Sequence, residues 1–418
     1  MDRRVILYVL ALTVSVSVNV ILVIRVSVEH DIRWFHIKGR NGGSGLSERT
    51  TAWQVSGQES SRRSQNSSMD EQAILRKIGE ILGVTLKNSV NIETSETGNK
   101  KTDRTGTLPT HSLLPKAVST EHPQAPWSFN VTAANRFRAE LEVATMTQNL
   151  FVMTQTNVQL NGSVKYQAGT GYFNITKDFY SWLPRDLLFG YKKYGTCSVV
   201  GNGGILLNSG CGRKIDSADF VIRMNLPQMK NYTEDVGKKT NLVSVNPSIL
   251  KGRFNSLRSK ADKEAFINYT WYYQGAYLLI SAFTYQRVTK LSFSGYETVQ
   301  SAKGKTTNAS MIFGHPQHLD LATKFWKKKY NITERRLTSG LYLAGTALSM
   351  CRKTRLYGFW PFDQDRQGRV LTHHYYDNVT MSARHVKIRQ HAIPEEYAVL
   401  RGLHDRGVIH MTTDRCSS

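Results

Sequence analysis

Residues 196–207, with the sequence Thr-Cys-Ser-Val-Val-Gly-Asn-Gly-Gly-Ile-Leu-Leu, contain the pattern that decides the fold. The apolar run at 196–200 indicates a buried strand, the glycines at 201–204 a turn, and 205–207 the opening of a helix. Further strands are predicted at 218–224, 242–245, 277–280 and 354–357, and helices at 133–150, 319–330 and 339–350. Strands that alternate with turns and helices predict an α/β domain with a largely parallel central sheet.

The glycine-rich turn itself allows two interpretations. Backbone N–H groups close to a helix start can bind an anion, but a plain tight turn explains the glycines equally well. A dinucleotide fingerprint is excluded because Leu206 stands where the third glycine or alanine is needed, and a P-loop is excluded because no Gly-Lys-Ser/Thr follows.

The N-terminal quarter of the chain differs from the rest. Residues 5–24 are uncharged and apolar after Arg3 and Arg4, which predicts a transmembrane signal-anchor with residues 1–4 in the cytosol. A cleaved signal peptide is the alternative, but the apolar run ends in Ile-Arg-Val and not in a small-residue cleavage site. Residues 25–126 are rich in Ser, Thr, Gly, Gln and Asn and predict a flexible stem, followed by a lumenal domain at 127–418.

The formal net charge of the 418-residue chain is +23, and most of it belongs to the predicted domain. Residues 127–418 contain 39 basic and 20 acidic residues, a net charge of +19. A hydrophobic content of 40% excludes a wholly disordered chain. Such a charge is compatible with nucleic-acid binding, but the predicted anchor argues against a nucleic-acid partner.

Glycosylation sequons and cysteines also favour a lumenal location. The Asn-x-Ser/Thr pattern occurs at Asn66, Asn130, Asn161, Asn174, Asn231, Asn268, Asn308, Asn331 and Asn378. The four cysteines, Cys197, Cys211, Cys351 and Cys416, allow three disulfide connectivities, among which their spacing does not choose. A zinc site is disfavoured because no two cysteines have the short spacing of metal ligands.

Two further clusters could carry chemistry. Asp363 and Asp365 form an Asp-x-Asp pattern, but its Pro, Gln, Gly and Arg neighbours favour a solvated loop over a metal site. His373 and His374 begin a His-His-Tyr-Tyr-Asp run, and His391 is followed after five residues by Glu396. Imidazole groups suit acid–base catalysis near neutral pH, so catalytic and structural roles are both open for these histidines.

Four segments in this order resemble the motifs of animal sialyltransferases. The stretch from Cys197 to the Asn-Pro-Ser at 246–248 resembles the large sialylmotif, and 337–362 resembles the small one. His-Tyr-Tyr-Asp at 374–377 is similar to the third motif, and His-x4-Glu at 391–396 to the very small motif. The resemblance covers about 127–418, and the Gly-Phe-Trp-Pro-Phe and His-His-Tyr-Tyr-Asp-Asn strings favour the α2,8 branch.

The resemblance implies a single Rossmann-like domain of variant GT-A type and a role for each matching residue. His391 would be the catalytic base, and His374 would stabilise the departing phosphate. The residues expected to contact the donor CMP-sialic acid are Asn202, Asn225, Thr338, Ser339, Gly340, Trp360, His373 and His374. The family turn is usually Ser-Thr-Gly, whereas here Thr338 precedes Ser339. Disulfides Cys197–Cys351 and Cys211–Cys416 are also implied.

The implied reaction is inverting transfer of sialic acid to a terminal sialic acid of a glycolipid or glycoprotein. No metal or other cofactor is expected, because CMP carries a single phosphate that a histidine and a helix N-terminus can accommodate. The expected partners are the donor, the sialylated acceptor and the Golgi membrane, with no nucleic acid; a homodimer stays open. The basic residues at 324–336 either bind the acceptor or form a solvated helix face.

Three alternatives remain at this point. The first is an α2,3- or α2,6-sialyltransferase that acts on galactose or N-acetylgalactosamine. The second is a catalytically inactive, membrane-anchored glycan-binding protein of the same fold. The third, nucleic-acid binding, rests on charge alone.

Overall fold

The computed structural model describes residues 126–418 except 191–192, 334–335, 381–392 and 417–418. The predicted cytosolic tail, signal-anchor and all but the last residue of the stem lie outside the described residues, as do Asn66 and His391. These features stay predictions. Among the residues that are described, no helix combines the length and apolarity needed to cross a bilayer.

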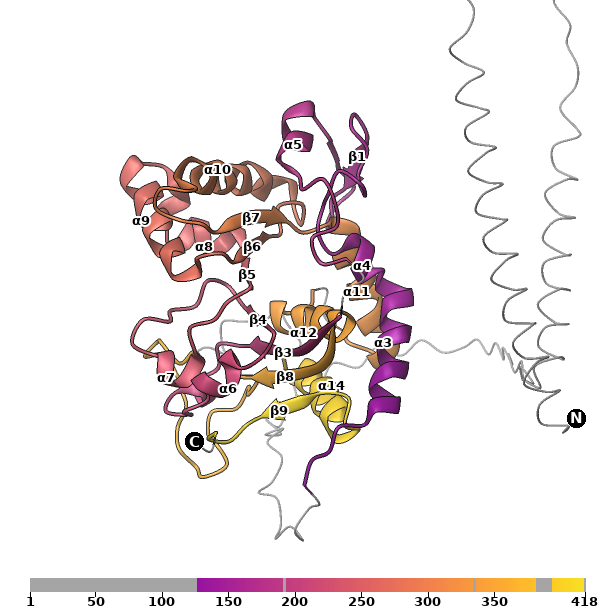
Figure 1. The fold of residues 1–418 in the computed structure, drawn as a ribbon, viewed down its shortest axis with the longest axis vertical. Helices are drawn as coiled ribbons and strands as arrows, with labels where there is room; N and C mark the ends of the chain where they lie inside the picture. Colours follow the sequence, from indigo (N-terminus) through magenta and orange to yellow (C-terminus); the bar gives the residue numbers. More distant parts are fainter. Residues whose placement is uncertain (1–125, 191–192, 334–335, 381–392, 417–418) are drawn as a thin grey trace, which may run out of the picture. The chain divides into compact units, whose positions relative to one another are not determined.

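A parallel sheet of seven strands forms the centre of the described part, in the order β7-β6-β5-β4-β3-β8-β9 (Figure 1). Its strands are β3 (Tyr194–Val200), β4 (Phe220–Arg223), β5 (Leu242–Val245), β6 (Tyr277–Ile280), β7 (Ser310–Phe313), β8 (Cys351–Tyr357) and β9 (His410–Thr412). The strands β1 (Ser163–Lys165) and β2 (Tyr172–Asn174) form a separate antiparallel pair. The predicted α/β class with a parallel sheet is therefore confirmed.

Helices and short helical turns connect these strands. The helices are α3 (Val131–Thr145), α4 (Thr147–Leu150), α5 (Lys177–Trp182), α6 (Gly212–Asp216), α7 (Thr233–Val236), α8 (Pro247–Gly252), α9 (Lys260–Thr270), α10 (Gln286–Ala302), α11 (Pro316–Tyr330), α12 (Ser339–Met350) and α14 (Ile393–Asp405). The 3₁₀ turns are η1 (Gly204–Leu206), η2 (Asn255–Leu257) and η3 (Trp271–Tyr273). Figure 1 shows α3 beside α11, and the two helices are in contact.

Both faces of the sheet are buried. Each strand contributes to both cores, because its successive side chains point to opposite faces. Val199 of β3 and Ile222 of β4 pack into a core with α3, α11 and α12. Their neighbours Val200 and Val221 pack into a second core on the opposite face, which includes Leu250 of α8. This double burial explains why the strand sequences are continuous apolar runs and do not alternate between apolar and polar residues.

Several predicted elements have the observed bounds, and others needed correction. The strands at 242–245 and 277–280 and the helix at 339–350 are confirmed without change. The predicted helix at 133–150 is interrupted at Met146, whose φ of 52° is left-handed, so two helices form. The helix expected to open at 205–207 is a single 3₁₀ turn, η1.

The sequence pattern missed the long helix α10 because its buried face contains small and polar side chains. Ser292, Gly295 and Thr298 are buried on this helix beside Tyr296 and Val299, so large apolar residues make up only part of its buried face. A Cβ atom on Gly295 would lie 2.9 Å from Leu250 Cδ1, which shows how closely α10 packs against α8. The close packing of α10 against α8 is a tertiary contact that the hydrophobic pattern of the sequence does not reveal.

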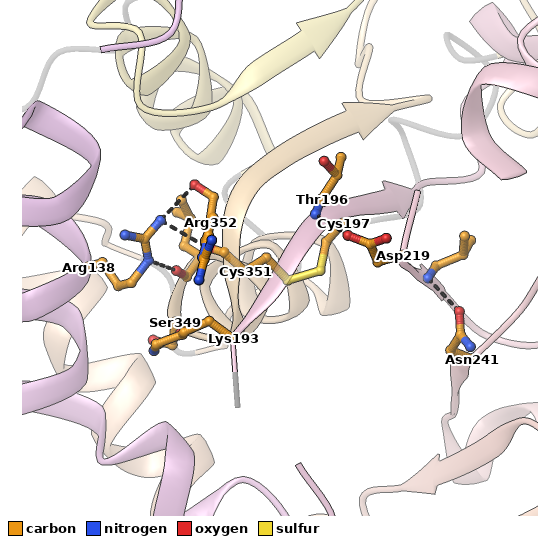
Figure 2. The surroundings of a disulfide bond; sticks show 11 residues. Arg138, Lys193, Thr196, Cys197, Asp219, Asn241, Ser349, Cys351 and Arg352 are labelled. Carbon is orange, nitrogen blue, oxygen red and sulfur yellow. Dashed lines mark hydrogen bonds between the residues drawn. A yellow bond between two sulfur atoms is a disulfide. The ribbon is translucent and has the colours of Figure 1, made fainter. Parts of the chain in front are cut away.

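The structure contains the two disulfides that the resemblance implies, Cys197–Cys351 and Cys211–Cys416. Figure 2 shows the first, which joins β3 to the first residue of β8, with Arg138 of α3 beside it. The Arg138 guanidinium donates to the Cys351 carbonyl at 2.8 Å. The disulfide joins residues 154 positions apart in the chain, and the Arg138 hydrogen bond joins residues 213 positions apart.

Candidate active site

A pocket of about 300 Å³ lies where four neighbouring parallel strands end. Its walls follow the carboxyl ends of β3, β4, β5 and β8, the edge at which open α/β sheets commonly bind ligands. It is lined by all eight residues expected to contact the donor: Asn202, Asn225, Thr338, Ser339, Gly340, Trp360, His373 and His374. Residues from three distant sequence motifs therefore meet in one cavity.

The glycine turn after β3 is a tightly packed turn whose first two glycine N–H groups are already used. Gly201 N–H donates to the Tyr357 carbonyl at 2.7 Å, and Gly203 N–H donates to the Gly358 carbonyl at 3.1 Å. A Cβ atom on Gly203 would lie 2.7 Å from the Gly358 carbonyl oxygen. Of the two interpretations of this segment, the tight turn is the one observed for Gly201 and Gly203.

Asparagines follow three of these strands, and two of them that line the pocket have a buried side-chain oxygen. Asn202 Nδ2 donates to the Met224 carbonyl at 3.0 Å. Asn225 has a left-handed φ of 60°, and its N–H donates to Ser244 Oγ at 3.0 Å. Within the described part of the chain, the buried Oδ1 atoms of Asn202 and Asn225 find no hydrogen-bond partner. Buried polar atoms are normally paired, so these two are suited to accept hydrogen bonds from a ligand.

Asn246 lines the same pocket and was not among the predicted contacts. It follows β5 as Asn202 follows β3, and its Nδ2 donates to Ser339 Oγ at 3.4 Å. An asparagine directly after a predicted buried strand was the signal that could have identified it.

The N-terminus of α12 opens into the pocket. Thr338 is its N-cap and accepts a hydrogen bond from Leu341 N–H at 3.1 Å. Ser339 and Gly340 begin the helix. The first N–H groups of a helix and its dipole favour a negative charge, so this end of the pocket suits a phosphate.

Two glutamates at the start of α14 hold the segment that precedes α12. Glu395 accepts from Thr333 N–H at 3.1 Å. Glu396 accepts from Thr338 N–H at 2.8 Å and from the Thr338 hydroxyl. Glu396 is only 3% exposed, and burial raises its pKa to about 7 in spite of the two hydrogen bonds from Thr338. The glutamate of the His-x4-Glu pattern therefore positions the N-cap of the helix at the pocket.

The histidine pair forms another wall of the pocket. His374 Nδ1 lies 2.9 Å from Asp377 Oδ2, and its ring stacks on Tyr376. A hydrogen bond from Nδ1–H to the Asp377 carboxylate orients the ring. His373 lies against His374, with ring centroids 4.1 Å apart. A bridge between Gly203 and His374 joins this segment to the turn after β3.

Aromatic side chains close the remaining side. Trp360 Nε1 donates to the Gln364 carbonyl at 2.8 Å, which fixes the indole ring. Tyr397 packs edge-on against Trp360 and Phe362, and Tyr397 also lines the pocket. A flat apolar surface of this kind can contact a base or a sugar ring.

The Asp-x-Asp pattern forms part of a turn in the structure. Asp365 accepts from Gln367 N–H and Arg369 N–H and pairs with the Arg369 guanidinium at 2.7 Å. These contacts hold the pKa of Asp365 below its usual value even though its burial acts in the opposite direction. Neither Asp363 nor Asp365 lines the pocket.

The sequon positions are compatible with glycan attachment. The asparagines at eight of the nine sequons lie in the described residues, and all are exposed: Asn130, Asn161, Asn174, Asn231, Asn268, Asn308, Asn331 and Asn378.

Comparisons with known proteins identify the family of the chain. Residues 145–408 match the model of Glycosyltransferase family 29 (sialyltransferase). The alpha-N-acetylneuraminide alpha-2,8-sialyltransferase of Xenopus laevis is 38% identical over 314 residues, which cover 74% of this chain and 83% of the relative. Alpha-2,8-sialyltransferase 8F of Mus musculus is 36% identical over 297 residues, covering 71% and 72%.

Among solved structures, a mammalian sialyltransferase in complex with Gal-beta-1-3GalNAc-ortho-nitrophenol is 19% identical, with a TM-score of 0.43. This match covers 70% of this chain and 99% of the other. Because the family model spans more than half of the sequence and both relatives align over most of their length, the chain belongs to glycosyltransferase family 29, the sialyltransferases.

Proposed function

We propose that this sialyltransferase moves sialic acid from CMP-sialic acid to a terminal sialic acid of a glycolipid or glycoprotein, in α2,8 linkage and without a metal. The observation that carries the proposal is the single pocket that gathers all eight expected donor contacts at the carboxyl edge of the sheet. The names of the relatives, which are α2,8-sialyltransferases, support the linkage.

The polar groups of the pocket match the chemical groups of the donor. The buried Oδ1 atoms of Asn202 and Asn225 would accept hydrogen bonds from the hydroxyl or amino groups of the nucleotide. The start of α12, at Ser339 and Gly340, would receive the single phosphate. Because these groups are already oriented before the donor binds, binding costs little conformational entropy.

The proposed transfer consists of the following bond changes. An acceptor hydroxyl oxygen forms a bond to the anomeric carbon while the bond from that carbon to the phosphate oxygen breaks. The electron pair stays on the departing CMP phosphate, the hydroxyl proton goes to His391, and the configuration inverts. His374, with Nδ1–H directed to Asp377, would donate from Nε2 to the phosphate when its ring is cationic.

Location and metal use complete the proposal. The apolar segment at 5–24 would anchor the chain in the Golgi membrane with the domain in the lumen, in agreement with the exposed sequons. A histidine and a helix N-terminus would balance the charge of one phosphate, so activity should persist in a chelator.

The test is an acceptor panel with the full chain in detergent and radiolabelled CMP-sialic acid. The panel pairs a sialylated ganglioside, O-glycan and N-glycan with their desialylated counterparts, and half of the reactions contain EDTA. Equal α2,8 product on sialylated acceptors with and without EDTA is expected. Transfer to the desialylated acceptors in α2,3 or α2,6 linkage, or glycan binding without transfer, would refute the proposal.

A further inference from the structure

The two most exposed aromatic side chains among the described residues each lie close to a glycosylation sequon. Tyr172 is 61% exposed, and Trp271 is 59% exposed. Asn174 follows Tyr172 by two residues, and Asn268 precedes Trp271 by three. Each ring leaves roughly 100 Å² of largely apolar surface in water, which a neighbouring group can cover.

On β2, Tyr172 and Asn174 point to the same face. Side chains two residues apart in a strand share a face. Phe173, which stands between them, points the other way and packs against the rings of Phe179 and Phe283. Tyr172 and Asn174 are both exposed and lie about 7 Å apart along the strand. A sugar on the Asn174 amide would therefore lie beside the tyrosine ring.

The neighbouring strand leaves room for a sugar on this face. Asn174 pairs with Ser163 of β1, and Tyr172 pairs with Lys165. Side chains directly opposite each other in an antiparallel pair lie next to one another, and Ser163 and Lys165 are exposed as well. Because serine is small, the space beside Asn174 is open on the side of the partner strand.

On α9, Asn268 and Trp271 share a face through helical spacing. Residues three apart are neighbours on a helix surface, and Trp271 continues the helix with φ −56° and ψ −31°. Asn268 is exposed, whereas Phe266 and Thr270 on the other face of α9 are buried. The ring of Trp271 lies at 85° to that of Tyr272, so these two rings do not stack face to face.

We propose that N-glycans are attached at Asn174 and Asn268 and that the first N-acetylglucosamine of each covers the neighbouring ring, Tyr172 or Trp271. This inference rests on the lumenal location given in the proposed function, and it does not depend on the transfer reaction. The faces of an aromatic ring carry negative charge, and one face of the sugar presents C–H groups that are slightly positive. Contact between the two faces also removes apolar surface from water.

Attachment requires a glycan donor from the cell, an oligosaccharide linked to a lipid diphosphate. The asparagine amide nitrogen forms a bond to the anomeric carbon of the first sugar, while the bond from that carbon to the phosphate oxygen breaks. The electron pair leaves with the lipid diphosphate, and one amide hydrogen leaves as a proton. The fold tolerates a bulky glycan at Asn174 and Asn268 because both asparagines are exposed.

The experiment measures how fast hydroxyl radicals oxidise the two rings in the full chain in detergent, produced in cells that attach oligomannose glycans. Mass spectrometry of peptides gives the occupancy of each sequon and the oxidation rates of Tyr172 and Trp271 relative to Trp127. Trp127 is a suitable reference because its ring stacks on His404, with centroids 5.7 Å apart. The samples are the untreated protein, the protein trimmed by an endoglycosidase to one N-acetylglucosamine per site, and two glutamine variants.

Each variant should uncover one ring and serves as the control for the other. Asn174→Gln should roughly double the rate of Tyr172, because a sugar covers one of the two faces of a ring, and should leave Trp271 unchanged. Asn268→Gln should have the reverse effect, since β1 with its partner β2 and α9 lie in separate regions of the domain (Figure 1). Trimming to one sugar should change neither rate. A variant that fails to fold is replaced by the folded protein after complete enzymatic removal of its glycans, which should uncover both rings.

The outcomes separate this inference from the proposed function. Occupied sequons combined with oxidation rates that do not change when the glycans are lost would overturn the inference. A rate that rises on trimming alone, or a single variant that uncovers both rings, would also overturn it. Glycans at other sequons but not at Asn174 and Asn268 refute the inference and leave the lumenal location standing. If no sequon carries a glycan, that location is wrong too, whereas α2,8 transfer is decided by the acceptor panel.

Discussion

Replacement of Glu396 by glutamine should change how the stability of the domain depends on pH. The Glu396 carboxyl is buried and binds Thr338 twice, and burial raises its pKa from the ordinary 4.5 to about 7. The folded protein therefore binds this proton more tightly than the unfolded chain does. Glutamine has nearly the same shape and cannot titrate, so Glu396→Gln removes only the contribution of this proton to stability.

The sign and size of the effect follow from the two pKa values. Because the folded-state pKa is raised, the protonated carboxyl contributes fully below about pH 4.5, and the contribution is lost as pH rises through about 7. A shift of two and a half units at 1.36 kcal/mol each is about 3 kcal/mol, of which about 2.5 kcal/mol falls between pH 5 and pH 8.

The assay is urea unfolding of the full chain in detergent, followed by tryptophan fluorescence at several pH values. The quantity compared is the free energy of unfolding of the unchanged protein minus that of Glu396→Gln. This difference cancels the contributions of the buried His315 and the half-buried His410. Burial lowers the pKa values of both to about 4, and their stability contribution has the opposite sign.

The expected result is a difference that falls by about 2 to 3 kcal/mol from pH 5 to pH 8. A difference that is constant over this range would refute the argument, because the carboxyl would then titrate alike in both states. Glu396→Ala serves as the comparison variant. It leaves Thr338 N–H without its acceptor, and a cost of about 1–3 kcal/mol and a higher donor KM are expected at every pH.

Four further predictions concern the site and its disulfide frame. His374→Ala should lower kcat by about 10²–10³ with little change in CMP binding, measured by steady-state kinetics and calorimetry. Asn225→Ala should raise the donor KM roughly tenfold while kcat changes little, and an unchanged donor KM would contradict its role. His391→Ala should reduce transfer by about 10²–10⁴ while CMP still binds, so near-normal turnover would exclude it as the base. Cys416→Ser should lower the free energy of unfolding by about 2–5 kcal/mol in urea titrations under non-reducing conditions.

Much of the fold could be predicted because the parallel strands are buried on both faces. Such strands are short apolar runs bounded by turn residues, and 242–245 and 277–280 were identified with their observed bounds. The helix at 339–350 was found for a similar reason, since its last ten residues are all buried. By contrast, α10 was missed, and its buried face includes Ser292, Gly295 and Thr298 beside the apolar Tyr296 and Val299.

The site residues themselves could be named from sequence motifs, but several of their contacts could not. Asn202, Ser339 and His374 were expected near the donor and do line one pocket. Asn246 was missed as a lining residue, and Glu396 was noted only as part of a motif, with no partner assigned. Hydrogen bonds between residues 58 positions apart, such as that of Thr338 to Glu396, leave no periodic signal in a sequence.

The sequence by itself determined the α/β class and the four segments that resemble family motifs. It also identified the expected donor contacts and the four cysteines available for pairing. The tertiary structure decided which groups these residues use. It occupies the N–H groups of Gly201 and Gly203 within the protein and leaves two asparagine oxygens for a ligand. The physical reason is that a parallel sheet brings the ends of strands from distant parts of the chain to one edge, where contacts depend on spatial order and not on spacing along the chain.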